Sequence, residues 1–87
     1  MRRTDVESRT VDSGAVLVDM RSGAAFELNR IGAEIWELLR PGTTQTAICD
    51  ALAARYKVDR VLLEFDVTTL IRSLADAGLI QGEPERK

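Results

Sequence analysis

The stretch AVLVDMRSGAAFELNRIGAEIWELL, residues 15–39, decides the fold because its apolar pattern changes period once along its length. Val16, Val18 and Met20 alternate with Leu17 and Asp19, and Ala24, Phe26 and Leu28 alternate with Ala25 and Glu27. Both segments, residues 15–20 and 24–28, thus have the two-residue period of a half-buried strand. Between them, Gly23 can adopt a positive φ without steric cost, which suits a three-residue hairpin loop over 21–23 that ends in a bulge. We therefore predict a β-hairpin of these two strands.

Directly after the hairpin, the apolar spacing becomes helical. Asn29 can cap a helix through its side-chain oxygen, and apolar residues then recur with helical spacing from Ile31 to Leu39. Pro41-Gly42 ends this helix. Gly32 lies in the first turn, where we expect it to permit close packing against the sheet.

Two more helices are predicted further along the chain. Thr43 or Thr44 caps the second helix, and Gly78 ends the third at its C′ position, where a left-handed residue stops a helix. The buried face of the second helix is predicted to contain Ile48, Leu52 and Tyr56, flanked by Cys49 and Ala53. The apolar stripe of the third helix is predicted to contain Leu63, Val67, Leu70, Leu74 and Ala77, with Ile71 beside it.

The first twelve residues are polar with a weak alternation, which is typical of an edge strand. The order of elements is then a three-stranded antiparallel sheet at the N-terminal end, followed by three helices. This order favours an α+β fold of the small winged-helix-like type. We predict one domain over residues 1–80 and a disordered tail over residues 81–87.

The composition favours a binding module over an enzyme. A chain of 87 residues builds one small core, and its lack of histidine removes the usual general base and the commonest metal ligand. Its single cysteine, Cys49, forms neither an intrachain disulfide nor a metal cluster by itself, and we expect it to be buried. No apolar run approaches about 18 residues. We therefore expect no cofactor, no metal, no membrane segment and a reducing cytoplasm as the compartment.

Acidic residues occur in pairs, but none of the pairs carries a catalytic signature. Glu34 and Glu37 are interpreted as a solvated helix face, beside a Trp36 that we assign to the core. Asp66, next to Glu64 and Phe65, has two interpretations. It is either an N-terminal charge or cap for the third helix, or a contact with a partner.

The residues themselves leave two functions open. The winged-helix order suggests a DNA-binding regulator, but the net charge is -2, and Arg60 and Arg72 share the third helix with several acids. The other function uses strand 24–28, whose edge beside the third helix would form an apolar trough. An extended peptide could add to that edge through main-chain hydrogen bonds. Alternatively, residues 4–11 or the C-terminal tail cover the edge.

The stretch LVDMRSGAAFELNRIGAEIWELL, residues 17–39, resembles the PqqD-like family. The resemblance covers about residues 15–80 and is closest to stand-alone members such as those of lasso-peptide pathways. A tight hairpin and Ala24-Ala25 distinguish this chain from the pyrroloquinoline-quinone version of the family. The motifs that carry the resemblance are the Ser-Gly turn, Leu28-Asn29, Gly32, Ile35-Trp36, Asp66-Val67 and the closing Gly78-Leu79-Ile80.

The resemblance implies a precursor-peptide recognition element. Such a domain has no enzymatic activity; it binds the leader of a ribosomally made peptide and presents the peptide to a separate modifying enzyme. That enzyme would be a leader peptidase with a cyclase, or a radical SAM enzyme. The leader is expected to add as a strand, with a basic side chain meeting Asp66. The implied peptide-binding residues are Ala24, Ala25, Phe26, Glu27, Leu28, Leu63, Asp66, Val67, Leu70 and Ile71.

Overall fold

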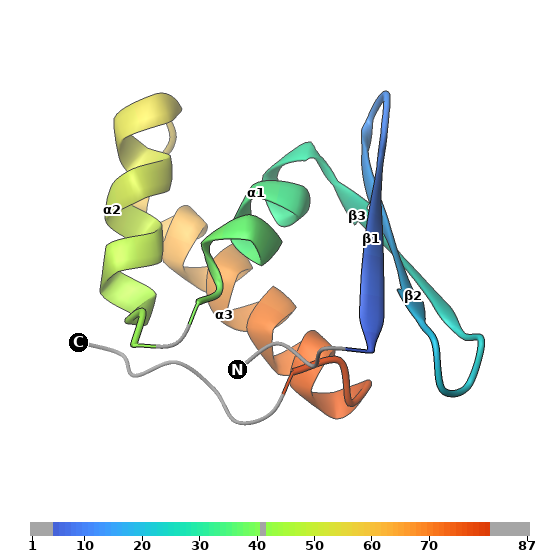
Figure 1. The fold of residues 1–87 in the computed structure, drawn as a ribbon. Coiled ribbons are helices and arrows are strands. Elements are labelled where there is room, and N and C mark those ends of the chain that lie inside the picture. The colour runs from blue at the N-terminus through green and yellow to red at the C-terminus, as the bar shows by residue number, and fades with distance from the viewer. Residues whose placement is uncertain (1–4, 41, 81–87) are drawn as a thin grey trace.

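A computed structural model describes residues 5–40 and 42–80 of the chain. In this part, an antiparallel sheet in the order β1-β2-β3 precedes three helices, which gather on one face of the sheet (Figure 1). The elements are β1 (Val6–Val11), β2 (Gly14–Asp19), β3 (Ala25–Asn29), α1 (Arg30–Leu38), α2 (Gln45–Arg55) and α3 (Arg60–Asp76). This confirms the predicted α+β fold. The tail predicted over 81–87 lies outside the described residues.

The turn between β2 and β3 is one residue longer than predicted. The Asp19 N–H donates to the Ala24 carbonyl at 2.9 Å, and the Gly23 N–H donates to the Asp19 carbonyl at 2.7 Å, so residues 20–23 form the loop. The nearly buried Asp19 carboxylate causes the difference, because it accepts the Arg21 N–H at 2.9 Å and holds the longer turn. The predicted positive φ of Gly23 is confirmed at 79°.

Side-chain caps set where the helices begin. The Asn29 Oδ1 accepts the Gly32 N–H at 2.7 Å at the start of α1, which confirms the predicted cap. The Thr44 hydroxyl accepts the Ala47 N–H at 3.1 Å, which decides between the two candidate threonines of α2. Asp59 caps α3 by accepting the Val61 N–H at 2.8 Å. The interpretation of Asp66 as the cap or N-terminal charge of α3 is therefore wrong, because the helix begins two turns earlier.

The end of α3 follows the prediction. Gly78 adopts a φ of 75°, and its N–H donates to the Ala75 carbonyl at 3.0 Å. The Leu79 N–H donates to the Leu74 carbonyl at 2.9 Å. These two bonds form a Schellman motif, which turns the chain so that Leu79 and Ile80 are buried in the core.

The core lies between the inner face of the sheet and all three helices. Trp36 and Cys49 are buried in it, as predicted, and burial raises the pKa of the Cys49 thiol. The core cluster comprises Ala15, Leu17, Leu28, Ile35, Trp36, Leu39, Ile48, Cys49, Leu52, Leu63, Val67, Ile71, Leu74, Leu79 and Ile80.

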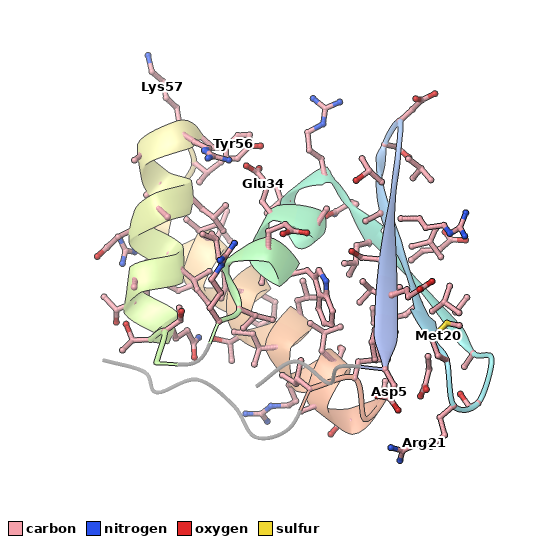
Figure 2. The ribbon with its side chains drawn as sticks, viewed as in Figure 1. Asp5, Met20, Arg21, Glu34, Tyr56 and Lys57 are labelled. Carbon is pink, nitrogen blue, oxygen red and sulfur yellow. The ribbon has the colours of Figure 1, made fainter. Side chains whose placement is uncertain are left out.

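Glu34 is not the solvated side chain that we predicted. Its carboxylate accepts hydrogen bonds from the Tyr56 hydroxyl and the Arg55 guanidinium, and Figure 2 shows it directed toward Tyr56. These contacts join α1 to the end of α2. The hydrogen bond from Tyr56 is the main cause that holds the pKa of Glu34 below its ordinary value of 4.5. Only the tertiary packing of α1 against α2 brings these residues together.

The lowered pKa of Glu34 predicts acid sensitivity of the fold. A depressed carboxyl pKa contributes stability above the unfolded-state pKa and loses it as the pH falls through the folded-state pKa. At pH 7 we expect Glu34→Gln to lower the free energy of unfolding by about 1 kcal/mol, or the Tm by roughly 4–8 °C. From about pH 5 down to pH 3, the Tm values of the two proteins should converge. The exposed Glu37 offers a matched control, Glu37→Gln. A Tm difference between wild type and Glu34→Gln that does not change with pH would contradict this role.

Candidate functional site

A groove of about 360 Å³ lies between β3 and α3. Phe26 and Leu28 of β3 form one wall, and Leu70 of α3 forms the opposite wall. Ile31 and Ile35 of α1 also line it. The groove thus has large apolar walls, with polar side chains of α3 beside them.

Gly32, in the first turn of α1, lies close to both walls of the groove. A Cβ at this position would lie 3.4 Å from both the Leu28 Cβ and a Leu70 methyl carbon, and 3.2 Å from the Asn29 side-chain oxygen. The predicted close packing of Gly32 against the sheet is confirmed. The first turn of α1 therefore touches both walls of the groove at one point.

α3 presents two different faces. Leu63, Val67, Ile71 and Leu74 are buried in the core, with at most 3% of their surface exposed. Asp66, Thr69, Leu70 and Ser73 line the groove instead. The second set follows the i, i+3, i+4, i+7 spacing of a helix face. The apolar pattern of the sequence could not distinguish the groove residues of α3 from its core residues, because Leu70 is as hydrophobic as the core leucines beside it.

The structure brings together only some of the residues that the sequence placed in the peptide site. Phe26, Glu27, Leu28, Asp66 and Leu70 line one groove. Leu63, Val67 and Ile71 lie in the core behind it. Ala24 closes the β2–β3 turn just before β3 begins, and Ala25 is exposed at the start of β3.

The backbone of β3 has an open edge along this groove. β3 pairs with β2, and no other strand of residues 5–40 and 42–80 pairs with it. In an antiparallel pair, every second residue of a strand forms hydrogen bonds with the partner strand. The Asp19 N–H donates to the Ala24 carbonyl, so Phe26 and Leu28, two and four residues further on, also bond to β2. The N–H and C=O groups of Ala25 and Glu27 therefore point away from the sheet, toward any strand that adds there.

Sequence reasoning missed several groove residues. Thr69 and Ser73 follow from Asp66 by helical spacing, so a search along that face would have found them. The sequence places Ile31 in the apolar stripe of the first helix, and only the structure reveals it as a groove residue.

Large apolar side chains also stand exposed near the start of α3. Val61, Leu62 and Phe65 are 73%, 62% and 68% exposed. Leu62 precedes Asp66 by one helical turn, so this apolar surface continues the groove-lining face of α3. Such a contiguous exposed patch is typical of an interaction surface.

The described residues contain a second hollow but no cluster of metal ligands. Among residues 5–40 and 42–80, no three His, Cys, Asp or Glu side chains are placed to hold a metal ion. In the same part of the chain, no helix is long and apolar enough to cross a bilayer. A second hollow of about 240 Å³, between α2 and α3, is lined by Gln45, Thr46, Cys49, Glu64 and Thr68. A hydrogen bond from the Gln45 amide to the Thr68 hydroxyl crosses between these helices.

These features define a small α+β domain whose sheet edge opens beside an apolar, helix-walled groove. The sequence pattern of the PqqD family, described as coenzyme PQQ synthesis protein D, matches residues 14–80. The chain belongs to this family, which confirms the resemblance seen in the sequence.

Two solved structures are similar to this chain over nearly their whole length. "TbiB1 in Complex with the TbiA(beta) Leader Peptide" is 34% identical, with a TM-score of 0.82 over 97% of this chain and 98% of that chain. "Lasso peptide synthetase B1 complexed with the leader peptide" is 30% identical, with a TM-score of 0.81 over 94% of this chain and 96% of that chain. No curated protein matches the sequence.

Because α3 has a core face and a groove face, we expect alanine substitutions on the two faces to lower the free energy of unfolding by different amounts. Leu74 is fully buried, so we expect Leu74→Ala to lower the free energy of unfolding by about 2–5 kcal/mol. Leu70 is half-buried at the groove, and Leu70→Ala should cost about 1 kcal/mol because less of its surface leaves water on folding. Urea unfolding of both variants measures the difference. Equal costs would show that Leu70 belongs to the core and not to the groove.

Proposed function

We propose that this protein binds the leader segment of a ribosomally synthesised precursor peptide and presents it to a separate modifying enzyme. The observation that carries the proposal is the open backbone edge of β3 beside an apolar groove. This is the geometry that strand addition requires, because main-chain bonds supply affinity and the groove selects side chains. Both similar structures hold a leader peptide, which supports the same ligand here.

Each part of the site has a distinct task in this proposal. Ala25 and Glu27 offer main-chain hydrogen bonds to the leader strand. Phe26, Leu28 and Leu70 receive every second leader side chain, because alternate residues of a strand point to the same face. These contacts require apolar leader side chains at the inward positions.

Two further groups of the predicted site residues have different tasks. Asp66 is exposed at the groove rim and forms an ion pair with a basic leader side chain. Leu63, Val67 and Ile71 act from the core, where they hold α3 in place behind the groove. They position the groove wall without touching the leader.

The protein acts on its ligand by binding and presentation, with no chemical step of its own. The modifying enzyme is a separate protein that receives the bound precursor in the cytoplasm, where the precursor is synthesised. The likeness to a lasso peptide synthetase B1 supports a leader peptidase with a cyclase over a radical SAM enzyme.

The charges on α3 argue against the DNA-binding alternative. Arg60 is engaged by Asp50 at 2.8 Å and by Glu64 at 2.9 Å. Arg72 is exposed on the same helix, but so are Glu64, Asp66 and Asp76, so α3 presents no excess of basic charge. A helix that contacts DNA needs unpaired basic side chains to neutralise phosphates. We therefore expect no specific affinity for DNA.

Strand addition predicts that one backbone N–H of β3 is essential. Glu27→Pro removes an N–H that faces the leader but leaves the bonds to β2, which come from Phe26 and Leu28. We expect the Kd for the leader encoded beside this gene to rise about tenfold or more. Fluorescence anisotropy with a labelled synthetic leader measures it.

The matched control is Glu27→Ala, which changes the same side chain and keeps the N–H. Its Kd should stay within about threefold of the wild-type value, and circular dichroism should show that both variants are folded. Equal Kd values for the two variants would rule out strand addition at β3. No binding of wild type at about 50 µM leader would rule out the proposed function itself.

The proposed ion pair of Asp66 with a basic leader side chain predicts that reversing this charge weakens leader binding. Asp66→Arg should weaken binding of a leader with a basic side chain by roughly threefold to tenfold, and the loss should shrink at high salt. Asp76→Arg makes the same charge change at an exposed site of α3 that does not line the groove. If both variants weaken binding equally, the effect comes from net charge and Asp66 forms no specific pair.

A further inference from the structure

β1 forms the second open edge of the sheet. It pairs with β2, and no other strand of the described residues pairs with it. The Met20 N–H donates to the Asp5 carbonyl at 2.8 Å, and the bonding then alternates along β1. The N–H and C=O groups of Val6, Ser8 and Thr10 therefore point outward and are available to another strand.

The side chains of β1 carry opposite charges two residues apart. Glu7 and Arg9 are both exposed, and residues at this spacing lie on the same face of a strand. Suppose that a second copy of β1 approaches antiparallel, with the twofold axis at Ser8. Glu7 of each copy then lies opposite Arg9 of the other, at a non-hydrogen-bonded position where facing side chains come closest.

In this register the outward backbone groups of the two β1 strands also pair with each other. Ser8 faces Ser8 of the second copy, and Val6 faces Thr10, so all the outward N–H and C=O groups pair in about six hydrogen bonds. The two neighbouring registers of the same bonding pattern place the axis at Glu7 or at Arg9. Each of these sets two like charges directly opposite one another, which destabilises a strand pair. The axis at Glu7 also sets Arg9 opposite Asp5, but the Asp5 carboxylate already forms an ion pair with Arg21 at 3.2 Å.

We propose that the protein self-associates through β1, forming a weak dimer in which two sheets join as one with the twofold axis at Ser8. The occupant is a second copy because the charge pattern of β1 is complementary to itself in this register. Charged side chains on an edge strand usually discourage pairing, and here they favour one register over its two neighbours. The β3 edge lies on the other side of β2, so each dimer carries two grooves for leader peptides.

The experiment is a charge swap followed by sedimentation equilibrium. Wild type should shift from 9.6 kDa toward twice that mass between about 10 and 500 µM, because an interface of this size is weak. Glu7→Arg and Arg9→Glu should each raise the dimer Kd by about tenfold or more, since each creates two like-charge pairs. The double variant, Glu7→Arg with Arg9→Glu, should return to within about threefold of wild type.

A second pair of variants tests the backbone contact independently of charge. Ser8→Pro removes the N–H at the axis, whereas the bonds to β2 come from Glu7 and Arg9. It should abolish dimerisation, while Ser8→Ala should leave it unchanged. The proposal is overturned if wild type stays monomeric at about 500 µM, or if the double variant dimerises no more tightly than the single variants.

Dimerisation through β1 and leader binding at β3 can be tested independently. Leader titration of the same β1 variants should show unchanged affinity, because the leader is expected at β3. If wild type is monomeric and Glu7→Arg weakens leader binding, then the leader and not a second copy occupies the β1 edge. If the leader fails to bind anywhere, the sedimentation result still decides the dimer.

Discussion

The close approach at Gly32 is the constraint on which the rest of the site depends. A Cβ at Gly32 would meet Leu28 and Leu70 at 3.4 Å and the Asn29 side-chain oxygen at a tighter 3.2 Å, so the first turn of α1 packs against both β3 and α3. Asn29 caps that turn, and it is also the last residue of β3. Strand and helix are therefore joined without a flexible linker, and the width of the groove follows from their contact.

The alternation of hydrogen bonds in the sheet decides where the protein can recruit other strands. β2 bonds to β1 through one set of its residues and to β3 through the other set, which leaves two outward edges. The surroundings of these edges differ. β3 borders an apolar groove, which suits a peptide with apolar side chains, whereas β1 is exposed along nearly its whole length and carries Glu7 and Arg9. The same backbone property thus underlies both proposals, leader binding at β3 and self-association at β1.

Much of the fold could be predicted because it rests on local rules. The positive φ of Gly23, the cap at Asn29 and the Schellman end at Gly78 all depend on residues within a few positions of each other. The errors arose where a side chain makes a contact that no local pattern contains. Asp19 lengthens a turn by bonding its backbone, and Glu34 meets residues of another helix.

The sequence by itself determined the element order, the histidine-free composition and the resemblance to the PqqD family, because each is read from residue types and short spacings. It also pointed to β3 and α3 as the walls of a site. Only the tertiary structure decided which α3 residues face the groove. Leu70 and Val67 are both apolar and nearly adjacent on the helix, so their roles depend on the angle at which α3 crosses the sheet and α1. That angle is a property of the packed core and not of any local segment.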